Sequence, residues 1–361
     1  MVKLNRWLAV PKRTPSVQTL DERKSAILKA VVRDHVATGE PVGSRAIVQR
    51  YPLGVKPATV RNEMAEMTDW GYLIQPHTSA GRIPSTLGYR YYVEHLRTNT
   101  TNLKFERYLK QLPQTGESLT ELLETTLGML AQVAHSASFA TTAQDDTLRL
   151  IRCVITHCGT HRALVVNIFE HGFVESRLVD LKHATSLRSL HRIQNVLLPL
   201  VEGQTVRYLL EMNPEQVPPM ESPTERETLS LLLRTIQSIA QEASEGELLY
   251  DGVAFILQQP EFQREVSQLE AVLRLLDERR ALYHLVERTH REMVTLQIGE
   301  ENPLEPLRCC TLVYTRYRVG ARISGVLGVL GPTRMDYDHI ISVVDQTAQA
   351  LSELLTKTLY S

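Results

Sequence analysis

The stretch PATVRNEMAEMTDWGYLIQPHTSAGRIP, residues 57–84, decides the fold of the first part of this chain. It opens with Pro57, and proline is favoured in the first turn of a helix because its missing N–H has no helical partner there. On a helical wheel Val60, Met64 and Met67 share one face. We therefore expect a helix at the start of the stretch, with this apolar face packed inward.

Two further helices and a hairpin surround that helix in the predicted fold. Residues 19–22, Thr-Leu-Asp-Glu, read as a capping box with Thr19 as the N-cap, and helical apolar spacing follows until Gly39. Ser44 is predicted to cap a short second helix. After the third helix, strand-like pieces at 72–75 and 82–83 flank a small-residue turn. Three helices and such a hairpin describe a winged helix-turn-helix, whose third helix lies in the DNA major groove.

The outer face of the third helix has the chemistry of base recognition. Its two alanines keep it flat, and Asn62 and Arg61 can make paired hydrogen bonds to adenine and guanine edges, so we expect these two and Thr59 to read bases. The alternative is an ordinary amphipathic helix whose outer face meets only water. The residues predicted to contact DNA are Ser44, Arg45, Lys56, Ala58, Thr59, Arg61, Asn62, Ala65, His77 and Arg82.

Within that set, the basic residues are expected to neutralise phosphates and set the register on DNA. These are Arg45, Lys56 and Arg82. His77 and Arg82 are the phosphate partners offered by the hairpin, the wing of the fold. Arg82 is the stronger of the two, because a histidine in a wing can equally remain solvated.

The charge is divided unevenly along the chain. The 361 residues carry a formal net charge of −1. The first 97 residues hold 15 Lys and Arg against 8 Asp and Glu, a net charge of +7, and the remainder holds 25 against 33, a net of −8. A basic end on an acidic body indicates a polyanionic partner, although a solvated basic face without a partner would give the same counts.

Several long motifs resemble the family of the heat-inducible transcription repressor HrcA. They are TGEPVGSR at 38–45, PATVRNEMA at 57–65, QPHTSAGRIP at 75–84, YRVG at 317–320 and GPTRMDY at 331–337. They stand at both ends of the chain, so the resemblance covers nearly all of it after Gln18. The sequence departs from the family at Lys56, where a serine is expected, at Leu87, and at Arg308-Cys309-Cys310, which replaces an Asp-Cys-Ser-like stretch.

The resemblance implies a fold and a function. The fold is α+β and multidomain, with a GAF-like α/β domain interrupted by a mainly helical inserted dimerisation domain. The function is repression of chaperone operons of the groESL and dnaK type, through binding of a homodimer to the CIRCE inverted repeat in double-stranded DNA. Heat stress removes the activity, the GroE chaperonin modulates it, and the protein is cytoplasmic and associated with the nucleoid.

The periodicity beyond the DNA-binding module fits this plan. We expect strands at 148–156, 163–169, 173–181, 294–298, 310–317 and 325–329, a helical block over 225–291, and a last helix at 338–358. The expected divisions are a basic tail at 1–18, the winged-helix domain with a linker helix at 19–97, the GAF-like domain at 98–212 and 291–361, and the insertion at 213–290. The leucine-rich stripe from Leu269 to Leu285 could form a dimer seam or intramolecular core.

Nothing in the sequence points to catalysis. It has no phosphate-binding loop, nucleophile elbow or His-Glu-x-x-His helix, so we expect no enzyme, catalytic residue or cofactor. The spacing of Cys153, His157, Cys158 and His161 matches no standard zinc pattern, so no metal is expected. Four cysteines fit a reducing cytoplasm, and no stretch reads as a membrane span. The alternative function is a small-molecule sensor, in which the GAF-like domain binds the ligand and the winged helix is the output.

Overall fold

The computed structural model confirms the α+β class and divides the chain into two compact units, each described here by itself. The first contains the N-terminal module, Leu123–Thr141 and Leu248–Ser361, and the second contains Thr115–Leu122 and Thr142–Glu247. The residues that the structure describes are 19–96, 119–142, 144–170, 173–213, 217–218, 220, 222–288, 293–320 and 322–360. The predicted basic tail at 1–18 lies outside them.

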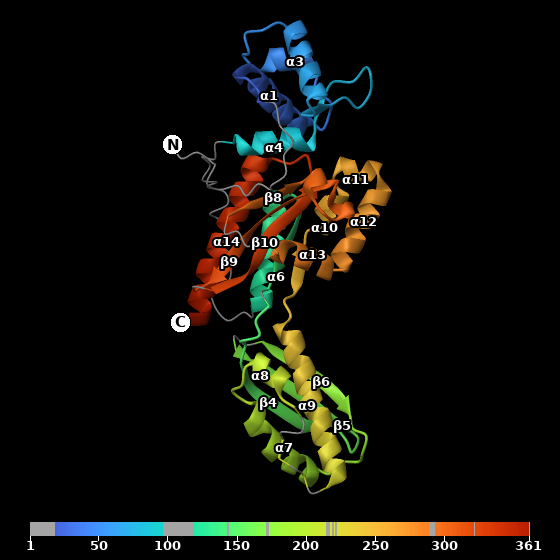
Figure 1. The fold of residues 1–361 in the computed structure, drawn as a ribbon, viewed down its shortest axis with the longest axis vertical. Helices are drawn as coiled ribbons and strands as arrows, with labels where there is room; N and C mark the ends of the chain where they lie inside the picture. Colours follow the sequence, from blue (N-terminus) through green and yellow to red (C-terminus); the bar gives the residue numbers. More distant parts are fainter. Residues whose placement is uncertain are drawn as a thin grey trace. The chain divides into compact units, whose positions relative to one another are not determined.

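The N-terminal module, residues 19–96, contains the three predicted helices and the predicted hairpin, followed by a fourth helix (Figure 1). Val60, Met64 and Met67 are buried as expected, as are Ile27 and Val31 of the first helix, and the first and third helices contact each other. The elements are α1 (Glu22–Thr38), α2 (Ser44–Arg50), α3 (Pro57–Asp69), β1 (Leu73–Ile74), β2 (Ile83–Pro84) and α4 (Thr86–Glu94).

Two predicted helix caps are wrong. Asp21, not Thr19, caps α1, and its carboxylate accepts a hydrogen bond of 2.7 Å from the Lys24 N–H. An aspartate two residues further along serves as well as a threonine, and its charge also suits the helix N-terminus. Gly43 is the N-cap of α2, and Ser44 is its first residue and buried. The predicted end of α1 is confirmed, because Gly39 has the left-handed φ of 72°.

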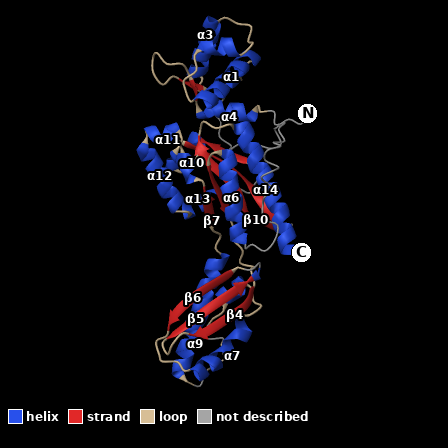
Figure 2. Ribbon diagram, turned by 180° about the vertical axis from the view of Figure 1, so that it is seen from behind, coloured by secondary structure: helices blue, strands red, loops and turns tan. Residues whose placement is uncertain are grey.

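The rest of the first unit is built on a five-stranded antiparallel sheet of order β7-β3-β10-β9-β8. One face is covered by α6 (Leu119–Ala134) and α14 (Tyr337–Tyr360), as Figure 2 shows. The strands are β3 (Ala137–Thr141), β7 (Leu248–Asp251), β8 (Thr295–Ile298), β9 (Cys310–Val319) and β10 (Arg322–Pro332).

The other face of that sheet packs against a run of short helices. Val272, Leu276 and Leu282 of this run are buried with Phe139 and Leu312 of the sheet in one apolar cluster. The leucine-rich stripe from Leu269 to Leu285, for which the sequence left a dimer seam and intramolecular core open, is therefore intramolecular core at these positions. The helices are α10 (Val253–Leu257), α11 (Pro260–Arg264), α12 (Val266–Asp277) and α13 (Arg280–Glu287).

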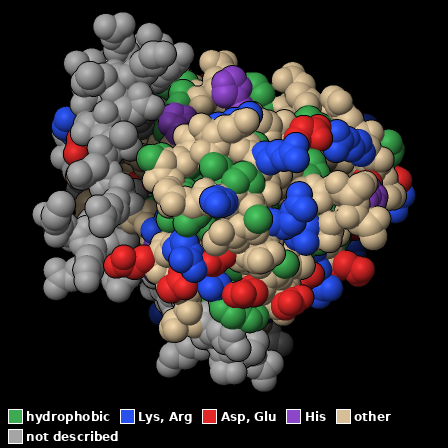
Figure 3. Space-filling model, turned by 90° about the horizontal axis from the view of Figure 1, so that it is seen from above, with side chains coloured by type: hydrophobic (Ala, Val, Ile, Leu, Met, Phe, Trp, Pro, Cys, Tyr) green, Lys and Arg blue, Asp and Glu red, His purple; other side chains and the backbone are tan. Residues whose placement is uncertain are grey.

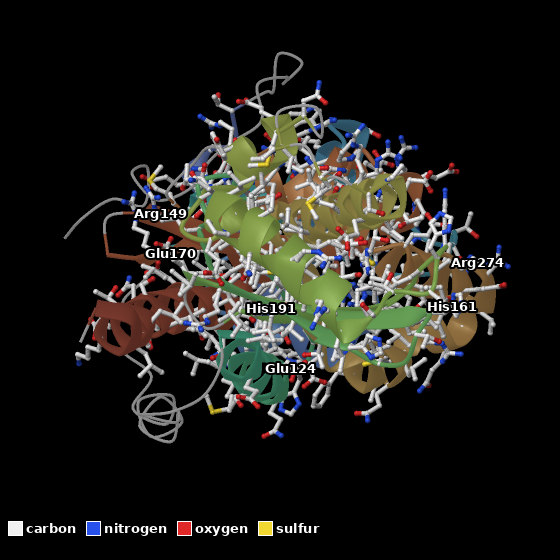
Figure 4. The ribbon with its side chains drawn as sticks, turned by 90° about the horizontal axis from the view of Figure 1, so that it is seen from below. Glu124, Arg149, His161, Glu170, His191 and Arg274 are labelled. Carbon is white, nitrogen blue, oxygen red and sulfur yellow. The ribbon has the colours of Figure 1, made fainter. Side chains whose placement is uncertain are left out.

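The second unit is a three-stranded antiparallel sheet with helices on one face. Helix α9 crosses in front of the strands in Figure 1, and the strands lie in front of the helices in Figure 2. Arg149 and Glu170, labelled in Figure 4, form an ion pair of 4.0 Å at one edge. The elements are β4 (Leu150–His157), β5 (Arg162–Phe169), β6 (Val174–Asp180), α7 (Leu187–Val201), α8 (Val206–Glu211) and α9 (Pro223–Ser244).

This division differs from the predicted insertion at 213–290. The main segment of the second unit is Thr142–Glu247 and contains three strands, whereas the helices between 253 and 287 pack on the five-stranded sheet. The periodicity located these helices but could not tell which sheet they cover, because that depends on the pairing of distant strands. Among the described residues, no helix is both long and apolar enough to cross a bilayer.

Candidate nucleic-acid interface

Helix α3 is fixed on α1 by ion pairs that also occupy two of its acidic side chains, Glu63 and Glu66. The Lys24 ammonium lies 3.1 Å from the Glu63 carboxylate and 3.2 Å from that of Glu66, and Arg23 donates to Glu63 over 2.7 Å. The carboxylates of Glu63 and Glu66 are thereby compensated from the α1 side. An anion approaching the opposite side of α3 meets little uncompensated negative charge from them.

The outward face of α3 presents the small and hydrogen-bonding residues expected there. Ala58, Arg61 and Asn62 are exposed, and Thr59 and Ala65 are half-buried. The spacing places them together because residues three and four apart lie on one side of a helix. The side chains of Asn62 and Arg61 are therefore accessible to a ligand that lies along the helix.

Exposed cations flank this face. Arg45 on α2 and Lys56 before α3 are exposed, and within the described part of the chain no ion pair engages Arg45, Lys56 or Arg61. Figure 3 looks onto the part of the first unit that carries α1 and α3. Lys and Arg side chains are spread over this view, and most Asp and Glu side chains lie along one edge. Such a face attracts phosphates.

The hairpin is attached to the segment before α2 by a short backbone bridge. Val42 and Arg82 exchange two N–H···O bonds of 2.9 Å each. Gly81 is required for this approach, because a Cβ there would lie 2.4 Å from the Val42 carbonyl oxygen. The bridge fixes the hairpin loop relative to α2, and nothing in our sequence reasoning identified it.

The structure places the two predicted phosphate partners of the hairpin differently. His77 is exposed in the loop. Arg82 is half-buried, and its Nε donates a 2.9 Å hydrogen bond to Thr68 Oγ1 at the end of α3. The guanidinium is thus held against α3 instead of extending from the tip of the loop. Ser44 is 8% exposed, so its hydroxyl offers little surface to a ligand.

Two arginines that the sequence reasoning did not single out hold the module on the five-stranded sheet domain. Arg90 of α4 is buried, donates to the Leu296 carbonyl over 3.0 Å and forms an ion pair with Glu301. Arg334 donates to the Val36 carbonyl of α1 over 3.0 Å. The only sequence signal was the position of Arg334 within the GPTRMDY run.

A cavity of about 340 Å³ lies at this same junction and not within the five-stranded sheet. Arg33 of α1 and Asp338 of α14 face it, and burial raises the pKa of Asp338. The remaining lining residues are Val36, Ala37, Tyr92, Met335, Asp336 and Tyr337. Its position differs from the cavity that the small-molecule-sensor alternative requires, which would lie inside the sheet domain.

The residues weighed as metal ligands do not converge. Cys153 is buried in the core of the second unit, where burial raises the pKa of its thiol to about 12, and Cys158 is exposed. His157 contacts the Thr185 carbonyl and His161 the Leu181 carbonyl. Within the described ranges no group of three or more His, Cys, Asp or Glu side chains is placed to hold a metal ion.

The family model and the curated relatives that match this sequence name one family. The family model described as the HrcA protein C-terminal domain matches residues 120–341. The heat-inducible transcription repressor HrcA of Desulforamulus reducens is 34% identical over 94% of this chain and 98% of its own length. That of Symbiobacterium thermophilum is 36% identical over 93% and 98%. A crystal structure of a hypothetical protein, 23% identical, has the same fold, with a TM-score of 0.65 over 94% of this chain and 99% of its own.

Proposed function

Because the chain belongs to the family of the heat-inducible transcription repressor HrcA, we propose that it represses heat-shock chaperone operons by binding operator DNA. Its operator is the CIRCE inverted repeat upstream of genes of the groESL and dnaK type, and it acts in the cytoplasm on the nucleoid. The observation that carries the proposal is the outer face of α3, where Arg61 and Asn62 are exposed between cations that no acidic side chain engages in the described structure.

In this proposal the N-terminal module is a winged helix-turn-helix. Helix α3 enters the major groove, its alanines allow a close approach, and Thr59, Arg61 and Asn62 read base edges. Arg45 and Lys56 neutralise phosphates beside the groove. Arg82, whose Nε is bonded to Thr68, presents its terminal guanidinium nitrogens to the DNA backbone at the base of the wing. Ser44 contributes through its backbone N–H at the start of α2, since its side chain is buried.

The assignment of base-reading and phosphate-binding roles is tested by two variants. Asn62→Ala should cost about 1–3 kcal/mol of operator binding and leave binding to random DNA unchanged. Arg45→Ala should weaken both DNAs alike and reduce the salt slope of log K by about 0.9 per lost phosphate contact. Arg274→Ala is the matched control, because it removes an exposed cation that lies on α12, outside the N-terminal module. An Asn62→Ala loss shared equally by random DNA would refute its role.

A homodimer is required to read an inverted repeat with two equal modules. The surface that we assign to the dimer contact is the open face of the three-stranded sheet in the second unit. The strand register aligns its outward residues in cross-strand rows, and Val154, Val174 and Leu178 are 41%, 54% and 53% exposed. Leu164, Val166 and Ile168 complete the face. An apolar patch of this kind is rare on a surface that meets only water.

The dimer surface is tested by charge insertion. Leu178→Asp should convert the protein to monomers in sedimentation velocity and weaken operator binding. Leu187→Asp is the matched control, because Leu187 is 70% exposed on α7, on the helical side of the same unit. If Leu178→Asp sediments as a dimer, the contact lies elsewhere.

The connectivity of the first unit supports a proposal for the loss of activity on heating and for assistance by GroE. The pairing of β3 with β10 joins Ala140 to Leu327, and β3 also pairs with β7 across the whole inserted unit. Such non-local pairing folds slowly and leaves apolar surface exposed on the way. We propose that a chaperonin protects these intermediates and that heat unfolds the marginally stable body. Operator binding lost at stress temperature without unfolding or aggregation would refute this mechanism.

A further inference from the structure

Cys309 and Cys310 bring their sulfurs together at the start of β9. The two Sγ atoms are 3.6 Å apart, and Cys309 Sγ lies 3.4 Å from the Pro306 carbonyl oxygen. Cys309 is half-buried and Cys310 is buried, so the two thiols differ in access to solvent. Cys309 is therefore the more accessible residue of the pair, and its sulfur lies beside that of the buried Cys310.

The two thiols also differ in acidity. The pKa of Cys309 is lowered, first because the Cys310 thiol donates a hydrogen bond to it, although burial opposes this effect. The pKa of Cys310 is raised well above its usual value by the same hydrogen bond and by burial. Since the thiolate is the nucleophile, Cys309 has the character of the attacking cysteine and Cys310 that of the resolving cysteine, which reacts second.

The backbone of the pair is connected to the joint that holds the N-terminal module. The buried Asn302 amide lies 3.1 Å from the Cys310 carbonyl oxygen and 2.9 Å from that of Leu307. It therefore holds the loop from Asn302 to Leu307 against the start of β9. Its neighbour Glu301 forms the ion pair with Arg90 of α4. Asn302 and Glu301, adjacent in the chain, thus connect the Cys310 backbone to that ion pair.

We propose that Cys309 and Cys310 form a hydroperoxide-sensitive thiol pair whose oxidation loosens the attachment of α4. Adjacent Cα atoms are about 3.8 Å apart across a trans peptide, shorter than the usual span of about 4.4–6.8 Å in disulfides. A bond between these sulfurs therefore requires the backbone to move at Cys310, and strained disulfides of this kind are readily reduced again. The oxidation is reversible for that reason.

The chemistry takes two balanced steps. The Cys309 thiolate attacks one oxygen of the hydroperoxide, an S–O bond forms and the O–O bond breaks. The leaving alkoxide, which is hydroxide when the oxidant is hydrogen peroxide, takes up a proton from solvent to give an alcohol or water. The Cys310 sulfur then attacks the resulting sulfenic acid, an S–S bond forms, and the S–O bond breaks. The leaving hydroxide takes the proton of Cys310 and departs as water. The thiol pair loses two electrons and the hydroperoxide gains them.

The test uses full-length protein carrying Cys158→Ser, which removes the exposed thiol of the second unit. After treatment with hydrogen peroxide, intact mass should fall by two hydrogens, and dithiothreitol should restore it. Adding Cys310→Ser should give a dimedone adduct at Cys309, and adding Cys309→Ser should abolish both products. In the unsubstituted chain, Cys309 should react several-fold faster than Cys158.

The structural consequence is measured by hydrogen–deuterium exchange. Oxidation should accelerate exchange of the α4 amides, and reduction should reverse the change. The readout does not involve DNA, so it is independent of the proposed repressor function. A pair oxidised no faster than Cys158 would refute the reactivity, and an oxidised pair with unchanged exchange in α4 would refute the coupling.

Discussion

The attachment of the N-terminal module depends on Arg90, and replacing it should be costly. In Arg90→Met the apolar chain is kept while the guanidinium is lost, together with its bonds to Glu301 and to the Leu296 carbonyl. The side chains of Arg90 and Glu301 are only 7% and 17% exposed. The variant therefore leaves a carboxylate in a poorly solvated site without its partner.

The size of the effect follows from that burial. Removing one partner of a buried ion pair costs about 3–5 kcal/mol. We expect about 3 kcal/mol, the lower end, because Glu301 keeps some exposure and still accepts a 2.9 Å bond from the Ile298 N–H. The double variant Arg90→Met, Glu301→Leu should lose about 2 kcal/mol less than the sum of the two single variants, because no charge is then left unpaired.

Urea unfolding followed by tryptophan fluorescence measures this loss. Trp70 lies at the end of α3, with the Lys24 ammonium 5.4 Å from its ring centroid, so it reports on the N-terminal module. Arg274→Met is the control, because it removes an ion pair with Glu270 whose side chains are 74% and 60% exposed and should cost at most about 1 kcal/mol. An Arg90→Met variant as stable as this control would refute the reasoning.

Three further predictions concern other parts of the fold. Burial lowers the pKa of His35 in the folded state. Its contribution to stability is therefore present above the unfolded pKa of about 6.5 and is lost as the pH falls through the folded pKa. His35→Gln should reduce the pH dependence of the thermal unfolding midpoint between about pH 5 and 7. Gly81→Ala should lower the free energy of unfolding in urea by roughly 1–3 kcal/mol, because the added methyl group pushes the hairpin away from Val42. An unchanged urea midpoint would contradict the close approach of Gly81 to Val42. Leu282→Ala should cost about 2–5 kcal/mol without changing the dimer dissociation constant in sedimentation equilibrium, because Leu282 is fully buried core and not a seam.

The sequence was most informative where local pattern decides structure. Pro57, the spacing of Val60, Met64 and Met67, and Gly39 in the left-handed conformation all follow from local rules, and the N-terminal elements agree with them. The strands predicted at 163–169 and 310–317 were found as β5 and β9 for the same reason, because alternation and β-branched residues mark them.

What the sequence could not reveal depends on distant partners. β7 is a four-residue strand within a helical block, and only its pairing with β3 makes it part of a sheet. That pairing also decides which unit the helices after Gly252 join, and this is why the predicted boundaries of the insertion differ. Arg90 and Glu301 are 211 positions apart, so no local pattern connects them. The exposure of Asn62 was predictable, whereas the bond from Arg82 to Thr68 was not.

The central claim is sequence-specific recognition of operator DNA, and fluorescence anisotropy tests it most directly. A labelled duplex carrying the CIRCE inverted repeat is titrated with the full-length protein at two salt concentrations, with GroE chaperonin present and a scrambled duplex as competitor. We predict saturation at one dimer per repeat, displacement by unlabelled CIRCE but not by the scrambled duplex, and weaker binding at the higher salt. Equal affinity for the two duplexes would contradict the account.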